Sequence, residues 1–349
     1  MIHKKNKIFP CKNLPAARSY RAMRQKVKIQ FADFWHGDDK IPDNPLFKLL
    51  SKRFELELSH SPDFLLYSCF GQDYLKYTCI RILYTGENLR PNFSECDYAF
   101  SFDFPVTQKN YRLPVYKLYD EFSALTAEKD VDAIFAQKSQ FCNFIYSNAL
   151  GRERIRFFKQ LSAYKHVDSG GKVCNNIGYR VKDKVDFLRP YKFTIAFEHS
   201  LFPGYTTEKI LHAMVAHTVP IYWGNPCVSR DFNPKSFINC HEYANFDEVI
   251  DKVIELDTDD DVYRSCLAEP YFQKNLENDY VNEENILNRF EDIFNQPHIT
   301  PVAQQRSIRN MTKRMLWRLI PTYLSGWHVF QQRTSWLSDL YRKATLHGV

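Results

Sequence analysis

The sequence lacks the features that mark several large classes of protein. No apolar run approaches the roughly 18 residues that a membrane-spanning helix needs, and no apolar signal-peptide stretch follows the basic first residues. The nine cysteines form no CxxC pair, and their odd number in a chain of 349 residues favours free thiols in a reducing compartment. We therefore expect a chain with neither a membrane span nor a disulfide framework.

Common nucleotide and metal motifs are missing as well. No GxGxxG follows a predicted strand, which argues against a dinucleotide cofactor, and the absence of GxxxxGK[ST] argues against a P-loop kinase. The histidines show no metal-ligand spacing such as HExxH. The acidic run Asp257–Asp261 follows a predicted helix end without apolar neighbours, so we interpret it as a solvated loop rather than a metal site.

Charge is unevenly distributed along the chain. Residues 1–30 hold nine lysines and arginines and no acidic residue, whereas residues 302–349 hold eight basic residues and one acidic residue. Because the whole chain has a net charge of only +6, its middle must be acidic. This distribution argues against a nucleic-acid-binding core and predicts basic arms on an enzyme-like body.

The basic C-terminal segment has helical periodicity. Its apolar residues recur every three or four positions, with arginine and lysine on the other faces: Ile308, Met311, Met315 and Leu319. This pattern is typical of an amphipathic helix that lies on an anionic membrane surface. The alternative is a helix that docks on the body of the protein and leaves its basic face in solvent.

Length and periodicity predict two α/β domains. Short apolar strands joined by helical links predict a first domain over residues 27–140, and a more regular alternation predicts a doubly wound second domain over residues 141–300. Residues 1–26 then form a basic N-terminal arm and residues 301–349 a basic amphipathic tail. The stretch Asp103–Gln140 has weak periodicity, and we interpret it as an excursion and linker.

The clearest pattern lies in the second domain. A strand at Phe193–Glu198 has one apolar face in alternation, and a loop marked by proline and glycine follows it. A helix over Glu208–Ala216, capped by Thr206 or Thr207, then leads to an apolar strand at Val219–Trp223. Strand, loop, helix and strand form a crossover unit, which predicts a parallel sheet.

This unit places charged residues where parallel sheets bind ligands. Ligands sit at the carboxyl ends of the strands, and the free N–H groups of the helix and the Lys209 ammonium both favour a phosphate there. Glu208 can accept hydrogen bonds from a sugar hydroxyl. The alternative is a Glu–Lys pair on an ordinary exposed first turn. In the first domain, Glu87 ends a strand on a glycine turn, where a general base can face the ligand, although many strand ends carry a glutamate.

A long run in the second domain closely resembles the donor-binding signature of the α1,3/4-fucosyltransferase family: FTIAFEHSLFPGYTTEKILHAMVAHTVPIYWGNPCVSRDFNPKSFINC. The likeness extends upstream through shorter segments: LYTGENLRPNF, DYAFSFDF, SNALGRERIRFFKQL, HVDSGG and NNIG. The resemblance implies a GT-B fold, in which two doubly wound Rossmann-like α/β domains face a cleft. It also implies that residues 27–140 bind the acceptor and residues 141–300 bind GDP-fucose.

The resemblance implies roles for six residues. Glu87, in TGEN, matches the proposed general base, and Arg154 matches an arginine that binds the pyrophosphate. In the TEK motif, Lys209 matches the phosphate ligand and Glu208 a partner of the donor hydroxyls. Two further positions line the donor site in the family: Tyr205, which matches an aromatic residue, and His199, which stands where the family commonly has asparagine.

The reaction that the resemblance implies is inverting transfer of L-fucose from GDP-β-L-fucose. The expected acceptor is an N-acetylglucosamine-containing glycan such as LacNAc on lipopolysaccharide, with α1,3 linkage of the Lewis type. No cofactor and no essential divalent metal are expected. Without a membrane anchor, the chain is similar to the bacterial branch, so we expect a cytoplasmic protein on the inner face of the inner membrane.

Two alternatives remain open at this point. One is a GT-B glycosyltransferase that uses another nucleotide sugar, and the other is a catalytically inactive, membrane-associated glycan-binding protein. The enzymatic interpretation requires that Glu87, Arg154 and Lys209 converge on one cleft.

Overall fold

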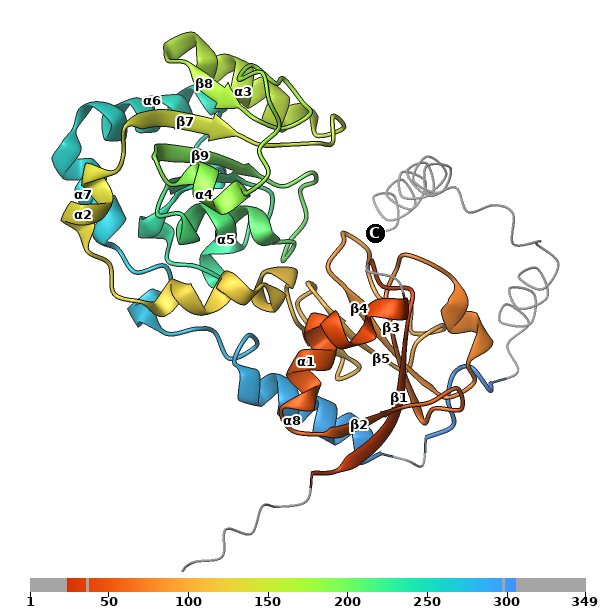
Figure 1. The fold of residues 1–349 in the computed structure, drawn as a ribbon. Helices are drawn as coiled ribbons and strands as arrows, with labels where there is room; N and C mark the ends of the chain where they lie inside the picture. Colours follow the sequence, from red (N-terminus) through yellow and green to blue (C-terminus); the bar gives the residue numbers. More distant parts are fainter. Residues whose placement is uncertain (1–23, 36–37, 297–298, 306–349) are drawn as a thin grey trace, which may run out of the picture.

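The computed structural model of the chain describes residues 24–35, 38–296 and 299–305. Most of the predicted N-terminal arm, and the amphipathic helix predicted in the tail, lie outside these residues. The described part forms two lobes, each built around its own parallel sheet (Figure 1).

The sheet of the first domain has six strands in the order β2-β1-β3-β4-β5-β6, all parallel. They are β1 (Lys26–Ala32), β2 (Glu55–Leu58), β3 (Phe64–Tyr67), β4 (Ile80–Thr85), β5 (Tyr98–Ser101) and β6 (Asn110–Arg112). The strands predicted before residue 103 are confirmed. The three-residue β6 lies in the stretch that we interpreted as an excursion and linker. It was not predicted, because so short a strand leaves little periodicity to detect.

The sheet of the second domain has five parallel strands in the order β11-β10-β9-β7-β8. They are β7 (Gln140–Phe144), β8 (Val167–Ser169), β9 (Tyr191–Phe197), β10 (Val219–Trp223) and β11 (Ile238–Asn239). The helices of this domain are α2 (Val131–Ala136), α3 (Arg152–Tyr164), α4 (Lys184–Leu188), α5 (Glu208–Val215), α6 (Phe246–Thr258) and α7 (Asp260–Ala268). The predicted crossover unit is confirmed as β9, α5 and β10.

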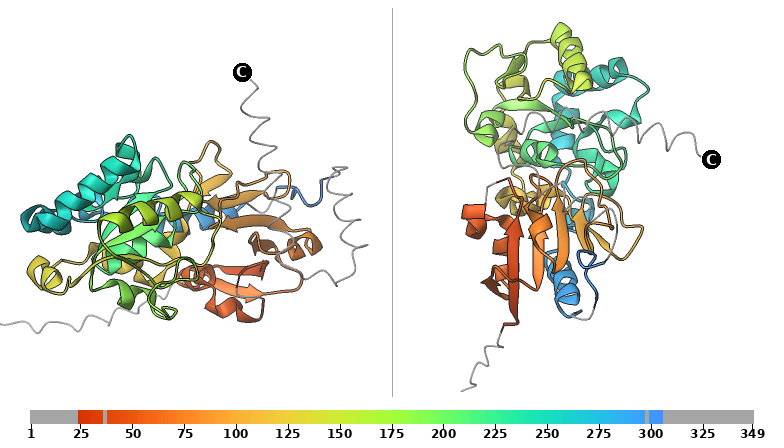
Figure 2. Two further views of the ribbon diagram at one scale, coloured as in Figure 1. Left: turned by 90° about the horizontal axis from the view of Figure 1, so that it is seen from above. Right: turned by 90° about the vertical axis from the view of Figure 1, so that its right-hand side faces the viewer.

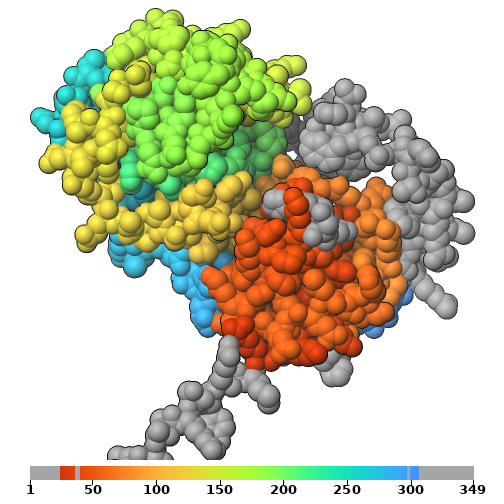
Figure 3. All heavy atoms as spheres, in the orientation of Figure 1, coloured from red at the N-terminus to blue at the C-terminus, as the bar shows by residue number. Residues whose placement is uncertain are grey.

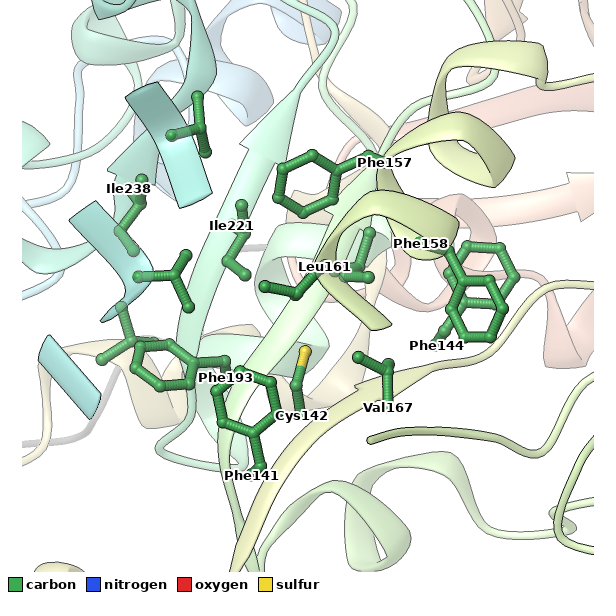
Figure 4. Packing of buried hydrophobic residues seen from close by; sticks show 14 of the residues in the cluster. Phe141, Cys142, Phe144, Phe157, Phe158, Leu161, Val167, Phe193, Ile221 and Ile238 are labelled. Carbon is green, nitrogen blue, oxygen red and sulfur yellow. The ribbon is translucent and has the colours of Figure 1, made fainter. Parts of the chain in front are cut away.

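Helices cover both faces of the second sheet. On one face, Phe157 and Leu161 of α3 pack with Phe193 and Ile221 of the strands (Figure 4). On the other face, Ile210, Leu211 and Met214 of α5 pack against Ala196 and Tyr222. Both faces of β9 are therefore buried, whereas the alternation of its residues predicted one buried face. The residues of β9 that face α5 are small and leave room for this helix. In the sequence, these small residues resemble the exposed, polar face of a strand.

Each lobe receives a segment from the other part of the chain. The helix α8 (Glu283–Phe294) packs on the first sheet, with the Phe290 and Phe100 rings stacked at 4.0 Å, although it lies within the range predicted for the second domain. In return, η3 (Val115–Leu118) and η4 (Asp120–Thr126) pack against α5. The right-hand view of Figure 2 shows α8 in blue beside the first sheet, and Figure 3 shows the yellow segment along the boundary of the lobes.

The acidic run at residues 257–261 spans the junction of α6 and α7, so its interpretation as a loop was wrong, whereas its solvated character is confirmed at residues 258–261, which are exposed. Asp257 pairs with Lys165 at 2.9 Å and its side chain is 4% exposed. Asp259 caps α7 by accepting hydrogen bonds from the backbone N–H groups of Asp261 and Val262. The run is structural.

Candidate active site

The loops after β4 and β9 bring the two domains together. The Asn88 side chain, next to Glu87, donates a hydrogen bond of 2.8 Å to the Ser200 hydroxyl, next to His199. This bond joins the turn that carries the predicted base to the loop that leads into α5. The carboxyl ends of the central strands therefore meet at one junction, as expected for ligand sites in parallel sheets.

Glu87 stands on a tight turn at the end of β4 and is open to solvent. Its backbone N–H donates to the Thr85 hydroxyl at 3.2 Å, which fixes the turn. Partial burial of the Glu87 carboxyl group by the surrounding protein raises its pKa. The charge of Lys209 lowers this pKa, whereas the charges of Glu208 and Glu198 raise it. Glu87 thus lies close enough to the charged residues of the second domain for their charges to act on its pKa, as the predicted convergence with Lys209 requires.

Lys209 is held by a carboxylate that sequence reasoning missed. Its ammonium lies 3.1 Å from Glu198 and 3.3 Å from Glu208, and it donates to the Thr207 hydroxyl at 2.8 Å. Burial disfavours the ammonium, but Glu198 and Glu208 outweigh burial and raise the pKa of Lys209 above its ordinary value. Lys209 is therefore a fixed, charged group at the start of α5.

Glu198 occupies the N-terminus of α5. Its carboxylate accepts hydrogen bonds from the backbone N–H of Thr207 at 2.8 Å and from the Thr207 hydroxyl at 2.8 Å. Burial raises the pKa of this carboxyl group, while the charge of Lys209 acts against the rise. The predicted open anion site at this helix end is thus partly filled by the protein's own carboxylate.

The approach of Glu198 depends on a glycine. Gly224 follows β10 with φ +151°, and a Cβ atom there would lie 2.5 Å from Cγ of Glu198. Glycine is the residue that tolerates both this backbone conformation and this close approach. The glycine that directly follows the predicted crossover unit therefore makes room for the carboxylate that holds Lys209.

Glu208 is strongly acidic in this setting. Burial alone would raise the pKa of its carboxyl group, but Lys209, Lys184 and His212 outweigh burial and lower the pKa to about 2. Lys184 lies on α4, which packs against α5. Glu208 therefore stays ionised at neutral pH and can accept hydrogen bonds from sugar hydroxyls.

The structure buries two of the residues that were predicted to contact the donor. Arg154 is 2% exposed, its guanidinium lies 4.3 Å from the centre of the Tyr146 ring, and it donates to the carbonyl of Asn148. Tyr205 is 2% exposed and contacts Phe102 edge-on at 5.2 Å. Arg154 lies close enough to Glu198 for their charges to interact, but its guanidinium is covered by the surrounding protein.

His199 lies at the edge of the site and is accessible from solvent. Its Nδ1 is 3.2 Å from the Tyr205 hydroxyl. The surrounding protein lowers the pKa of His199 to about 4, and Lys209 and Arg154 add to this shift. The ring is therefore neutral at physiological pH, as the asparagine common at this position would be.

Sequence reasoning found Glu87, Glu208 and Lys209 but missed three groups around them: Glu198, Lys184 and His212. Glu198 gave no sign of its role in the sequence, because an acidic residue after a strand does not show that folding will bury it. Lys184 and His212 carried no signal, because their closeness to Glu208 depends on how α4 packs against α5. The described residues contain no group of three or more His, Cys, Asp or Glu side chains suited to a metal ion.

A hollow of about 740 Å³ lies elsewhere, at the opposite edge of the first sheet, where β1, β3 and β4 begin. It includes neither Glu87 nor any of the charged residues around α5. The site is therefore defined by the convergence of charged groups at the strand ends rather than by this hollow.

Solved structures place the fold in the GT-B class. A crystal structure of an alpha1,3-fucosyltransferase with GDP is 32% identical, with a TM-score of 0.69 over 81% of this chain and 94% of that one. A crystal structure of an alpha1,3-fucosyltransferase with GDP-fucose is also 32% identical, with a TM-score of 0.68 over 83% of this chain and 96% of that one. The predicted α/β fold is confirmed.

The sequence identifies the family within that class. Residues 29–119 match the alpha-(1,3)-fucosyltransferase FucT N-terminal domain, and residues 135–288 match the C-terminal part of glycosyltransferase family 10 (fucosyltransferase). The chain belongs to this fucosyltransferase family, and the resemblance predicted from the motifs is confirmed.

Curated relatives agree with this placement. The alpha-(1,3)-fucosyltransferase FucT of Helicobacter pylori is 35% identical in an alignment that covers 72% of this chain and 63% of that protein. A putative fucosyltransferase of Acanthamoeba polyphaga mimivirus is 31% identical in an alignment that covers 44% of this chain and 26% of that protein. The chain thus spans less than two thirds of the length of either relative.

Proposed function

We propose that the chain is an inverting α1,3-fucosyltransferase that moves L-fucose from GDP-β-L-fucose to a hydroxyl group of a glycan. The observation that carries this proposal is the 2.8 Å hydrogen bond between Asn88 and Ser200, which joins the turn that carries Glu87 to the loop that leads to Glu208 and Lys209. Membership of the fucosyltransferase family and the likeness to a structure with GDP-fucose support the choice of donor.

The proposed reaction is a single displacement. The acceptor oxygen attacks the anomeric carbon of fucose, Glu87 takes the proton of the attacking hydroxyl, and the bond from the anomeric carbon to the diphosphate oxygen breaks. GDP leaves with the electron pair of that bond, and the configuration inverts because attack and departure occur on opposite faces. A raised pKa makes Glu87 a better proton acceptor than an ordinary glutamate.

The second domain would bind the donor. Lys209 is proposed to neutralise the charge that develops on the departing diphosphate, and Glu208 to accept hydrogen bonds from donor hydroxyls. Arg154 can join Lys209 only after the segment that holds its guanidinium, around Asn148, moves aside. We propose that these cations suffice and that the reaction needs no divalent metal.

The proposed acceptor is an N-acetylglucosamine-containing glycan such as LacNAc on lipopolysaccharide, with a Lewis-type product. The test is a transfer assay of the full chain with GDP-fucose, UDP-sugars and other GDP-sugars against a small acceptor panel, with and without EDTA. We expect α1,3-linked fucose on LacNAc from GDP-fucose alone, unchanged by EDTA. Transfer of another sugar would replace the donor assignment, and glycan binding without transfer would indicate an inactive lectin-like protein.

We further propose that the protein lies on the inner face of a bacterial inner membrane. The proposal rests on the basic periodic segment after residue 305, which lies outside the described residues. Among the helices that the structure does describe, none combines the length and apolar character needed to cross a bilayer. A variant that ends before residue 302 should lose binding to anionic vesicles, and unchanged partitioning would refute the proposal.

A further inference from the structure

A buried ion pair joins the edge of the first sheet to the second domain. Arg112 ends β6, and Asp231 follows the turn Val228–Arg230 (η5). The Arg112 Nη2 atom lies 2.6 Å and 2.7 Å from the two carboxylate oxygens of Asp231, so one nitrogen contacts both oxygens. The two side chains are 1% and 0% exposed. None of the proposed catalytic steps uses either residue.

The same two side chains hold the loop that leads into α5. The Nη1 atom of Arg112 donates to the carbonyl of Gly204 at 3.1 Å, and the Thr206 hydroxyl donates to Asp231 at 3.0 Å. Asn225 completes the set, because it accepts from the Gly204 N–H at 2.7 Å and donates to the Thr206 hydroxyl at 2.9 Å. Glu208 follows Thr206 by two residues and Lys209 by three, so this network directly supports the residues that are proposed to bind the donor.

The contacts leave little freedom at this point. Gly204 has φ +87°, and a Cβ atom there would lie 2.7 Å from the carbonyl oxygen of Phe102 and 3.0 Å from Nη1 of Arg112. The guanidinium also packs against two rings, with the centre of Phe104 at 4.3 Å and that of Tyr280 at 4.8 Å. Because one of its nitrogens contacts the carboxylate and the other donates to backbone carbonyls, the planar group fixes both the distance and the orientation of the segments that it joins.

A buried pair of this kind is poorly explained by stability alone. Removing two charges from water is expensive, and apolar side chains of similar volume often stabilise a fold equally well. What the pair adds is a fixed relative orientation, because a planar guanidinium can donate hydrogen bonds to a carboxylate in only a few arrangements. We propose that Arg112 and Asp231 are positioning residues, which set the donor loop at residues 202–207 in register with the domain that carries Glu87.

This inference rests on the proposed function and adds residues that act through others. Glu87 and Lys209 come from different domains, so their separation depends on how the domains are joined. A misplacement of about 1 Å in a reacting group can lower a rate about 100-fold. The pair therefore affects turnover more than the affinity for GDP, whose proposed ligands all lie in the second domain.

The test compares four forms of the full chain: wild type, Arg112→Met with Asp231→Asn, Arg112→Lys, and Lys117→Met. Lys117 is the matched control. It forms a half-buried ion pair with Glu277, with 3.2 Å between the charged atoms, and neither residue belongs to the donor loop. Arg112→Lys keeps the charge but loses the planar guanidinium that contacts Asp231 and the Gly204 carbonyl at once, and it provides a second reading should the double variant fail to fold. Each form is measured for thermal unfolding, GDP affinity by calorimetry, and kcat and KM for GDP-fucose.

We expect kcat to fall about 100-fold in the double variant and less in Arg112→Lys, while the Kd for GDP changes by less than about threefold and Lys117→Met behaves as wild type. Unchanged kcat in the folded variants would overturn the inference. A loss of GDP affinity that accounts for the whole fall in activity would also overturn it, because the pair would then shape the donor loop alone.

Hydrogen exchange gives a reading that does not depend on activity. Peptides that cover residues 110–113 and 202–207 should exchange faster in the double variant and in Arg112→Lys, both with and without GDP. Unchanged exchange would contradict the inference. Absence of fucosyl transfer by the wild type would instead contradict the proposed function, so the two failures can be distinguished.

Discussion

The two sides of the cleft are built in different ways. On the second-domain side, Lys209 and Glu198 are paired at 3.1 Å, with side chains 16% and 0% exposed. On the first-domain side, Glu87 is open to solvent, and its carboxylate has no hydrogen bond or ion pair within the described ranges. The donor side is thus organised before a substrate arrives, whereas the base is free to receive a proton. Preorganised charges suit a departing diphosphate, and an accessible carboxylate suits general-base catalysis.

The donor side is also less positive than the motif alone suggests. Lys209 shares its charge with Glu198 and Glu208. Because each carboxylate weakens the attraction of Lys209 for a phosphate, GDP is held less tightly than a lone lysine would hold it. The comparison therefore separates residues that act on the proton from residues that tune the hold on GDP.

The largest expected effect comes from the first-domain side. Glu87→Gln removes the proton acceptor but keeps the shape of the side chain, so transfer should fall about 100- to 10,000-fold while GDP affinity stays unchanged. The measurements are initial rates with saturating acceptor and calorimetric titration with GDP. Glu128→Gln, at an exposed position, is the matched control. Full activity in Glu87→Gln would remove the base assignment.

The next effect comes from the paired side. Lys209→Met leaves Glu198 buried without its counter-ion, which should lower the free energy of unfolding by about 3–5 kcal/mol. Chemical denaturation measures this loss. Adding Glu198→Gln should restore most of the stability but not GDP binding. If the double variant binds GDP as the wild type does, Lys209 is not a donor ligand.

A smaller effect should follow from Glu198→Gln alone. Removing one negative charge from the neighbourhood of Lys209 should tighten GDP binding roughly threefold to tenfold and slow product release. Calorimetry and a burst experiment test the two parts. Weaker GDP binding would contradict this account, because it would show that Glu198 mainly positions Lys209.

The smallest effect concerns pH. Glu87 must be deprotonated to act, so kcat/KM should fall as the pH drops through the pKa of Glu87, which lies above the ordinary glutamate value. Glu208→Gln removes a charge that raises this pKa, and the acidic limb should therefore shift to lower pH. His199, with a pKa of about 4, should add no limb near neutrality. An acidic limb that stays in place in Glu208→Gln would argue against the meeting of the two residues in the cleft.

Local patterns in the sequence were sufficient to predict the crossover unit from β9 to β10 and most of the strands. They failed where the outcome depends on packing between distant segments. Nothing in the periodicity of α8 indicates that Phe290 stacks on Phe100 of the other lobe.

The candidate site shows the same division. The TEK motif and the glycine turn at Glu87 were readable because they combine a chemical group with a strand end. Glu198 and Asp231 were not singled out, because an acidic residue in a sequence gives no sign that folding will bury it. Their burial follows from neighbours over a wide sequence range, such as Arg112 for Asp231.

The most direct test of the central claim is a crystal structure of the full chain with GDP-fucose. We expect the diphosphate to contact the Lys209 ammonium and the fucose to lie between Lys209 and Glu87, with the Glu87 carboxylate on the face opposite the leaving group. A diphosphate bound away from Lys209, or a fucose that faces away from Glu87, would contradict the account.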